Sequence, residues 1–313
     1  MNGKFTSIEE IQKSYKKEDY ICSKQIATTL FLAQHLQKPI LVEGPVGVGK
    51  TELAKTTAKY LNLELIRLQC YEGLDESKAL YEWKYGKQLL YTQILKDSLD
   101  KIVEDAVTLS EAMDKLHQHE DVFFSQNFLE PRPLLKALRS KQGAVLLVDE
   151  VDKADQEFEA FMLEILSDYQ ASIPEIGTIK ADTKPFVFLT SNNTREISDA
   201  LRRRCLHLYI PFPEPELEKE IVEVRVPEIS ENLKNQLIVF IQELRKLDLK
   251  KAPSISETID WAKVLMLLNV DCLDADLVRE TLSVILKFEE DVRSIQAKIE
   301  PMTEKAIKET EGQ

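Results

Sequence analysis

The sequence predicts an α/β fold, with a five-stranded parallel sheet flanked by helices and a smaller all-α domain after it. Two observations lead to this prediction. Five short apolar runs alternate with longer segments in which apolar residues recur at helical spacing, which is typical of α/β layer architectures. After residue 213 the strand-like runs stop and only helical periodicity continues.

Apolar residues dominate these five runs, and most of the runs are continuous and do not alternate with polar residues. Continuous apolar character indicates strands buried on both faces, as in a parallel sheet covered by helices. The runs are PILVEG (39–44), LELIRLQC (63–70), AVLLVDE (144–150), FVFLTSN (186–192) and LHLYIPF (206–212).

Helical periodicity fills the intervals and the second half of the chain. One amphipathic helix is expected within 95–116 and another within 158–169, where apolar residues recur every three or four positions. IPFPEPE (210–216) then interrupts the pattern with three prolines. We therefore expect an α/β domain over 1–213, a helical domain over 214–290 and a polar C-terminal tail over 291–313.

Composition and charge exclude several classes of protein. Acidic residues outnumber basic ones, 54 to 41, giving a formal net charge of −13 over 313 residues. This balance disfavours a nucleic-acid partner, because phosphate neutralisation supplies most of such affinity. Four scattered cysteines without a CxxC pair indicate reduced thiols, and the polar N-terminus has no signal-peptide core. No apolar run approaches 18 residues, so we expect a cytoplasmic protein without a membrane span.

GPVGVGKT (44–51) fits the phosphate-loop pattern G-x-x-x-x-G-K-[ST]. Its glycines allow the backbone to wrap a phosphate closely, Lys50 would reach the β- and γ-phosphates, and the Thr51 hydroxyl would ligate Mg²⁺. The following helix adds its N-terminal amides. A chance glycine turn is the alternative, which the strand before and the helix after disfavour. The expected ATP contacts are Gly44, Pro45, Val46, Gly47, Val48, Gly49, Lys50, Thr51 and Glu52.

AVLLVDEVDKAD (144–155) adds the groups that hydrolysis requires. Asp149, at the end of a buried strand, would bind Mg²⁺ directly or through water, and Glu150 would polarise the attacking water. The alternative is a solvated acidic turn after a strand. A calcium loop does not fit, because the acids fall at 149, 152 and 155 without the required glycine.

Several longer stretches resemble the MoxR family of AAA+ ATPases, particularly its CoxD-type maturation branch. The resemblance covers most of the chain. It lies in EGPVGVGKTELAK (43–55), LQCYEGLDESKALYEWKYGKQLLYTQ (68–93), LLVDEVDKADQEFEAFMLEILSDYQASIPEIGTI (146–179), FLTSNNTREISDALRRRCLHLYIPFP (188–213) and KAPSISETIDWAKVL (251–265).

The resemblance implies roles for further residues. Asn192 matches the sensor-1 position, although without the resemblance Asn192 and Asn193 would be read as a turn. ALRRRC (200–205) resembles the arginine-finger segment, which favours Arg204 first and Arg203 second. Such a finger acts on a neighbouring subunit's nucleotide and implies a ring, expected to be a hexamer. Local sequence alone favours a basic helix end that interacts with its own dipole.

The resemblance also leaves one departure and two insertions. Members of this class usually carry a sensor-2 arginine where this sequence has Glu257 and Thr258, and Lys251 or Lys263 are the candidates to replace it. The insertions are 71–93 and 171–186, expected to face the ring pore or a client. Whether the insertion's aromatic residues form a contact surface or core packing stays open for Tyr81, Trp83, Tyr85 and Tyr91.

The leading hypothesis is a Mg-ATP-hydrolysing chaperone that matures or remodels a protein complex such as a metalloenzyme. The resemblance implies a von Willebrand factor A domain partner and a protein client. One alternative is a nucleic-acid-directed AAA+ motor or loader, against which the acidic charge and the absence of a basic, aromatic-interleaved stripe argue. Another is a nucleotide-gated scaffold with weak turnover.

Overall fold

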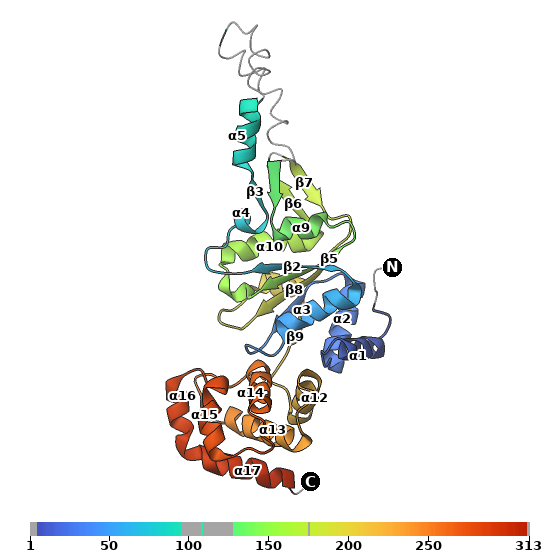
Figure 1. Cartoon of the computed structure of the whole chain (residues 1–313). Helices are drawn as coiled ribbons and strands as arrows, with labels where there is room; N and C mark the ends of the chain where they lie inside the picture. Colours follow the sequence, from blue (N-terminus) through green and yellow to red (C-terminus); the bar gives the residue numbers. More distant parts are fainter. Residues whose placement is uncertain (1–4, 95–107, 109–127, 175, 312–313) are drawn as a thin grey trace.

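A central five-stranded sheet organises the first two thirds of the chain (Figure 1). The computed structural model describes residues 5–94, 108, 128–174 and 176–311. All five strands are parallel, in the order β2-β5-β8-β1-β9. They are β1 (Ile40–Glu43), β2 (Glu64–Gln69), β5 (Ala144–Asp149), β8 (Phe186–Ser191) and β9 (Leu206–Tyr209). The predicted α/β class, strand number and orientation are confirmed.

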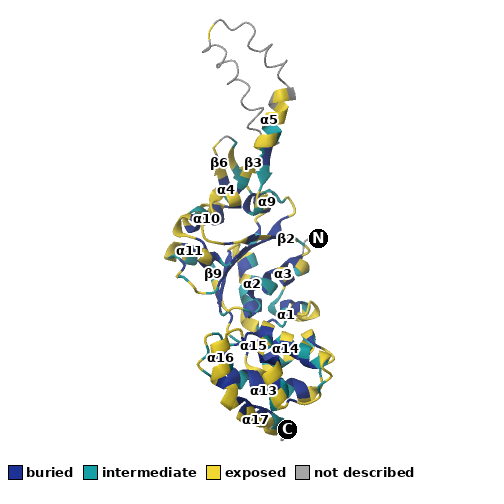
Figure 2. Cartoon of the chain, turned by 60° about the vertical axis from the view of Figure 1, so that its left-hand side comes forward, coloured by how far each residue is buried: buried dark blue, intermediate teal, exposed yellow. Residues whose placement is uncertain are grey.

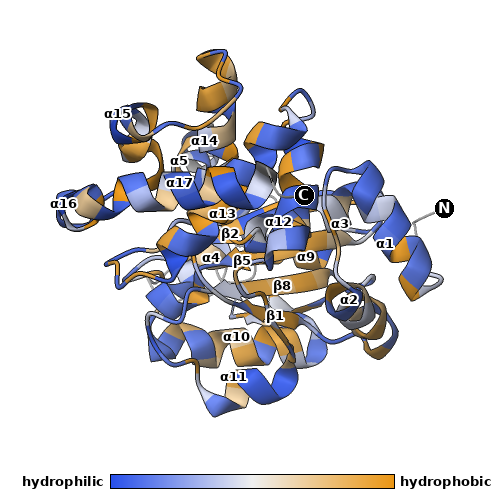
Figure 3. Cartoon of the chain, turned by 90° about the horizontal axis from the view of Figure 1, so that it is seen from below, coloured by the Kyte–Doolittle hydropathy of each residue, from blue (hydrophilic) through white to orange (hydrophobic). Residues whose placement is uncertain are grey.

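Helices cover both faces of this sheet, which explains why its inner strands β5, β8 and β1 are almost continuously apolar. One apolar cluster packs α1 (Ile8–Lys17), α2 (Lys24–Leu36) and α3 (Lys50–Leu61) against the sheet. The other cluster contains α9 (Pro133–Arg139), α10 (Gln156–Asp168) and α11 (Asp199–Arg204). The inner strands β5, β8 and β1 are accordingly buried and mostly apolar between the two helical layers (Figures 2 and 3). The edge strands β2 and β9 each have exposed positions.

Two small antiparallel units extend from the edge of the α/β part. The 71–93 insertion forms α4 (Glu76–Ala79), β3 (Tyr81–Trp83) and α5 (Tyr85–Ile94), with β3 paired to β4 (Leu129–Pro131). The 171–186 insertion forms the hairpin of β6 (Gln170–Ile173) and β7 (Gly177–Lys180). In Figure 1 both units lie at the end of the molecule opposite the helical domain. Most of the helix expected within 95–116 lies outside the described residues.

The C-terminal part is entirely helical among the residues that the structure describes. Its apolar cluster joins helices from residue 215 to residue 311. They are α12 (Pro215–Arg225), α13 (Glu231–Arg245), α14 (Ile255–Leu267), α15 (Ala275–Ile285), α16 (Glu289–Ile295) and α17 (Ile299–Glu311). No described helix is both long and apolar enough to cross a bilayer.

The expectation of a polar tail over 291–313 is wrong for its described part. Helix α17 packs along α13, and Ile299, Met302 and Ala306 are buried in the helical cluster. These residues recur at positions 1, 4 and 8 of the helix, so a sparse apolar stripe on a mostly charged segment is enough to dock it. The helical domain therefore extends to residue 311. Its boundary with the α/β part near residue 213 remains our proposal.

Candidate functional site

The phosphate-loop motif connects the end of β1 to the start of α3. Two of its glycines are required by close approaches of the backbone. A Cβ atom on Gly44 would lie 2.1 Å from the carbonyl oxygen of Ile210, and one on Gly47 would lie 2.2 Å from Ser254 Oγ. Gly47 also has a φ of +77°, which glycine adopts without strain. Ile210 and Ser254 come from distant segments, so the loop is pressed between the sheet and the helical domain.

Lys50 is buried at 7% exposure and its ammonium group has three acceptors. Nζ donates to the carbonyl oxygens of Gly44 (2.5 Å) and Pro45 (2.8 Å) and to Asn192 Oδ1 (2.7 Å). Burial lowers the pKa of Lys50 to about 8, against the opposing influence of Asp152, Asp149 and Glu150. The cation is thus held at the loop by its backbone and by the end of β8.

Asp149 ends strand β5, next to the edge strand β2, and is 3% exposed. The Thr51 hydroxyl lies 3.3 Å from both of its carboxylate oxygens, and Thr190 donates to Oδ1 at 2.5 Å. Arg67, on the edge strand β2, donates to Oδ2 through Nη2 (2.6 Å) and Nε (3.1 Å). A carboxylate and a hydroxyl at the phosphate loop are hard oxygen ligands of the kind Mg²⁺ prefers, so these residues fit the ion.

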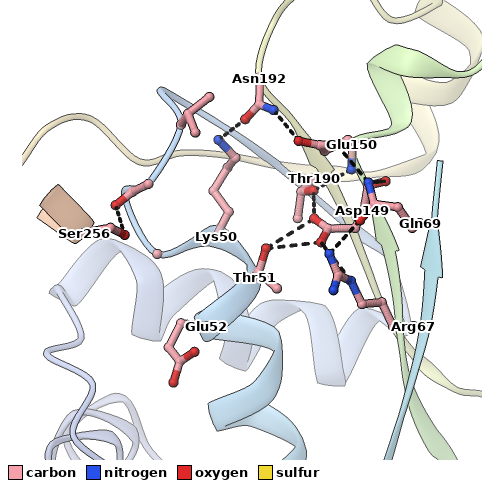
Figure 4. A pocket seen from close by; sticks show the side chains of 13 residues that line it. Lys50, Thr51, Glu52, Arg67, Gln69, Asp149, Glu150, Thr190, Asn192 and Ser256 are labelled. Atoms are coloured by element: carbon pink, nitrogen blue, oxygen red, sulfur yellow. Dashed lines mark hydrogen bonds and ion pairs between the residues drawn. The ribbon is translucent and has the colours of Figure 1, made fainter. Parts of the chain in front are cut away.

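Glu150 directly follows the strand in a left-handed conformation, with a φ of +58°. Its amide donates to Thr190 Oγ1 at 2.9 Å, which stabilises this turn. The carboxylate accepts hydrogen bonds from Gln69 Nε2 (2.8 Å) and Asn192 Nδ2 (3.1 Å) and pairs with Lys153 (2.7 Å). Three groups from three segments therefore fix the side chain that the sequence assigns to water activation. Figure 4 shows two of them, Gln69 and Asn192, beside Glu150.

Asn192 links the two halves of the motif. Its amide group contacts Lys50 on one side and Glu150 on the other. Buried Asp152 holds the segment that carries it, accepting from the amides of Asn192 (3.2 Å) and Thr194 (2.9 Å). Asn192 thus follows β8 directly and contacts both Lys50 and Glu150, and its assignment as a sensor residue stays a prediction.

These side chains line one cavity of about 340 Å³ at the carboxyl ends of the strands (Figure 4). Of the predicted nucleotide contacts, Gly44 and Pro45 contribute carbonyl groups to Lys50 instead of lining this cavity. The predicted residues that line it are Val46, Gly47, Gly49, Lys50, Thr51, Glu52, Asp149, Glu150 and Asn192. Arg67, Gln69, Thr190 and Ser256 also line it and were not predicted. Arg67 and Gln69 could have been predicted from their place near the carboxyl end of β2, because the carboxyl ends of parallel strands lie on the same side of the sheet.

A second cavity of about 340 Å³ adjoins the loop and is mostly apolar. It shares Gly47, Gly49, Glu52 and Ser256 with the first cavity. Its apolar wall comes from the segment before α2, from the loop, from the connection after β9 and from the helical domain. That wall includes Ile21, Ile26, Val48, Ile210, Phe212, Leu217, Ile221 and Ile259. No single stretch of sequence carries this pattern, so sequence analysis did not find it.

Arg203 and Arg204 lie away from both cavities. They are exposed at the end of α11, and with Lys38 and Pro39 they line a separate cavity beside the amino end of β1. Arg204 donates to Ser167 Oγ at 2.6 Å. Arg202, in contrast, forms two hydrogen bonds with buried Glu43, of 2.8 and 3.1 Å. Of the three consecutive arginines, Arg202 therefore forms an internal ion pair, whereas Arg203 and Arg204 face outward.

The position expected for a sensor-2 arginine has internal contacts. Glu257 pairs with Lys251 at 2.8 Å, and Thr258 donates to buried Glu218 at 2.8 Å. Lys263 is exposed and lines neither cavity. Ser256, which directly precedes Glu257 in the first turn of α14, donates to the carbonyl oxygen of Gly47 at 3.3 Å. In the described chain, α14 thus contacts the loop through a hydroxyl group.

Comparison with known proteins identifies one family. The model of the AAA domain, dynein-related subfamily, matches residues 39–205, more than half of the chain. An uncharacterised protein of Staphylococcus epidermidis is 24% identical, covering 92% of this chain and 96% of its own length. Another, from Staphylococcus haemolyticus, is 22% identical and covers 85% and 91%.

Two solved structures are also similar. The Thermotoga maritima RuvB Holliday junction branch migration motor gives a TM-score of 0.44 at 18% identity, covering 89% of this chain and 71% of that chain. A single-residue variant of the same motor gives a TM-score of 0.48 at 18% identity, covering 93% and 76%.

Proposed function

We propose that this chain, which belongs to the dynein-related subfamily of AAA domains, binds Mg-ATP between its two domains and hydrolyses it. The observation that carries this proposal is the convergence of Lys50, Thr51, Asp149, Glu150 and Asn192 on one cavity. They come from the ends of three different strands of the sheet, β1, β5 and β8. The corresponding functional groups are those that phosphoryl-transfer sites use.

Each residue has a distinct role in this proposal. Lys50 neutralises the phosphates, and the amides of the loop and of α3 donate to them. Thr51 and Asp149 would hold Mg²⁺, which supplies charge neutralisation at the phosphate oxygens. The apolar cavity beside Val48 suits the flat, weakly polar base of the nucleotide, because apolar walls with few polar groups are typical of cofactor sites.

Glu150 and Asn192 carry the hydrolytic step. The Glu150 carboxylate is positioned to accept a proton from water, and Asn192 contacts both that carboxylate and Lys50. Asn192 can therefore orient water relative to the phosphate that Lys50 binds. A site containing only Lys50 and the loop would bind nucleotide without turnover.

Replacing Lys50 and Glu150 separately tests both parts of the proposal. We expect Lys50→Ala to abolish nucleotide binding, because a phosphate charge loses its buried counterion. Glu150→Gln should bind ATP normally and fail to hydrolyse it, since Glu150 acts when water attacks. Direct ATP titration and phosphate release measure the two properties. Glu157→Gln, an exposed carboxyl change on α10, is the control and should retain wild-type turnover.

A Glu150→Gln protein that turns over at the wild-type rate would exclude the catalytic role. If the wild type binds ATP but turns over as slowly as Glu150→Gln, the nucleotide-gated scaffold is favoured. The observation that supports this second candidate is the first turn of α14. Among its described residues, none is an arginine that could contact the phosphate loop.

The work driven by hydrolysis belongs to the same proposal. By resemblance to the MoxR family, we propose that the chain is a cytoplasmic ATPase that forms a homo-hexameric ring. It would act with a von Willebrand factor A domain partner on a protein client. The exposed position of Arg203 and Arg204, far from their own chain's phosphate loop, supports action on a neighbouring subunit. The client would be a protein complex, such as a metalloenzyme, that requires maturation.

Added DNA distinguishes this function from that of a nucleic-acid motor. A net charge of −13 repels phosphate backbones, so we expect ATP turnover to be indifferent to single- or double-stranded DNA. Turnover that DNA stimulates several-fold, with strong salt sensitivity, would instead support the nucleic-acid-directed alternative.

A further inference from the structure

Arg67 was not predicted as a site residue, and its guanidinium group contacts the carboxylate expected to hold the metal. We infer that Arg67 is the counterion of Asp149 in the metal-free protein and competes with the divalent cation for that carboxylate. The inference rests on the proposed function, in which Asp149 is a metal ligand. It adds a residue that sets how readily the site accepts its metal.

The hydrogen-bonding capacity of Asp149 is already used. Oδ2 accepts two bonds from Arg67, at 2.6 and 3.1 Å, and Oδ1 accepts one from Thr190. The Thr51 hydroxyl lies 3.3 Å from each oxygen. An ionised carboxylate offers about four lone-pair sites. A cation that coordinates Asp149 must therefore replace at least one of these donors.

Arg67 is the donor that can leave. Thr190 is buried, and its hydroxyl also accepts the Glu150 amide, so its departure would leave a buried polar group without a partner. Thr51 is itself an expected metal ligand. The Arg67 side chain is 51% exposed on the edge strand β2 and can move into solvent without such a loss.

The local charge explains why a cation is needed there. Asp149, Glu150 and Asp152 lie within four residues, and Asp149 and Asp152 are buried. A buried carboxylate without a partner is strongly unfavourable, so a charge must offset Asp149 until the metal binds. Arg67 supplies that charge in a form that a divalent cation can displace.

The same guanidinium group is connected to Glu150. Arg67 and Gln69 share one face of β2, because side chains two positions apart in a strand point the same way. Arg67 Nη2 donates to Gln69 Oε1 at 2.6 Å, and Gln69 Nε2 donates to Glu150 Oε2 at 2.8 Å. Exchanging Arg67 for a metal at Asp149 thus also removes a partner from the amide that holds Glu150.

Mn²⁺ affinity tests the competition without measuring activity. Paramagnetic resonance would follow Mn²⁺ binding to the full chain with a non-hydrolysable ATP analogue. We expect Arg67→Gln to tighten the apparent Kd for Mn²⁺ about three- to tenfold, as removal of a half-exposed competing ion pair implies. Arg67→Lys, which keeps the charge without the two-bond geometry, should lie between it and the wild type.

Lys153→Gln is the matched control. It removes one positive charge from Glu150 without removing a contact to Asp149, and should change the Mn²⁺ affinity by less than about twofold. Equal shifts in both variants would mean that only the local potential matters and would overturn the inference. Weaker Mn²⁺ binding by Arg67→Gln would also overturn the inference. So would loss of nucleotide binding by Arg67→Gln in excess chelator, because Arg67 would then be a phosphate ligand.

Thermal melting in chelator tests the counterion role without nucleotide. Arg67→Gln should lower the Tm by about 2 °C, and adding Asp149→Asn should restore it, because no buried charge then lacks a partner. A single variant as stable as the wild type would contradict the counterion role. If the wild type binds no Mn²⁺-nucleotide complex, the proposed function fails, and melting still decides whether Arg67 neutralises Asp149.

Discussion

Lys50 directs all three of its ammonium protons to oxygen atoms of the nucleotide-free protein. Two acceptors are loop carbonyl groups that hold the loop together, and the third is the side chain of Asn192. A phosphate group that binds Lys50 competes most directly with Asn192, because that side chain can rotate. Binding at the loop is therefore coupled to the residue that also contacts Glu150.

The lowered pKa of Lys50 predicts a pH dependence of binding. The free protein loses the Lys50 proton as the pH rises through about 8, whereas bound phosphate favours the charged form. Binding above pH 8 must then take up a proton, so affinity falls with rising pH. We expect ATP affinity to fall about tenfold between pH 7 and pH 9.

Equilibrium titration with a fluorescent ATP analogue at both pH values, in matched ionic strength, measures this change. Lys153→Gln, which alters a lysine outside the loop, should show the same dependence as the wild type. Affinity that stays constant over the two pH units would mean that Lys50 keeps its proton in the free protein.

At the scale of elements, the 71–93 insertion contains aromatic residues of two kinds. Trp83, on β3, is 9% exposed and belongs to the core beside the sheet, with Tyr81 packed against that core. Tyr85, at the start of α5, is 66% exposed, and Tyr91 is also exposed. Trp83 and Tyr81 are therefore part of the core packing, whereas Tyr85 and Tyr91 remain available as a contact surface.

Separate alanine substitutions should reveal this division. We expect Trp83→Ala to lower the free energy of unfolding by about 3 kcal/mol, because it removes a large buried side chain. Tyr85→Ala should change it by less than about 0.5 kcal/mol and is the matched control. Urea unfolding measures both values. If Tyr85→Ala is as destabilising as Trp83→Ala, α5 packs more extensively than its exposure indicates.

Helix α17 is expected to be part of the helical domain's core. Ala306 is fully buried, so Ala306→Asp should destabilise the protein by about 3 kcal/mol, as an unpaired buried charge does. Lys308→Asp introduces the same side chain on the exposed face and should cost less than about 1 kcal/mol. Denaturant melts of both variants compare them, and equal stabilities would indicate that α17 does not dock in solution.

At the scale of the whole molecule, the two outward-facing arginines and the phosphate loop lie at opposite ends of the parallel strands. The loop follows the carboxyl end of β1, whereas Arg203 and Arg204 lie beside the amino ends of β1 and β9. One chain therefore cannot bring these arginines to its own cavity without refolding. Copies arranged head to tail could bring the arginines of one to the nucleotide of the next.

We expect Arg204→Ala to leave ATP binding intact and to lower turnover by about 10³-fold, as loss of a transition-state arginine does. Wild-type specific activity should rise with protein concentration. Mixing Arg204→Ala with Lys50→Ala should restore activity, because mixed interfaces can combine an intact loop with an intact arginine. Steady-state phosphate release measures all three effects. Undiminished turnover by Arg204→Ala would transfer the role to Arg203 or exclude it.

The sequence by itself determined the sheet and the phosphate loop. Continuous apolar runs need helices on both faces, and the spacing of Gly44, Gly47 and Lys50 is a local property of consecutive residues. Asp149 and Glu150 were found because they directly end a strand whose carboxyl end must adjoin the loop. These inferences needed only neighbours in sequence and the geometry of parallel strands.

Tertiary structure alone decided the remaining features. The contact of Arg67 with Asp149 depends on which strands are adjacent, and the apolar cavity gathers segments as distant as Ile21 and Ile259. The division of Arg202 from Arg204 depends on Glu43, which lies on β1, far from α11 in the sequence. Helix α17 was missed because its narrow apolar stripe gains meaning only against α13. Contacts between residues far apart in sequence leave no local pattern, since the chain's path brings them together.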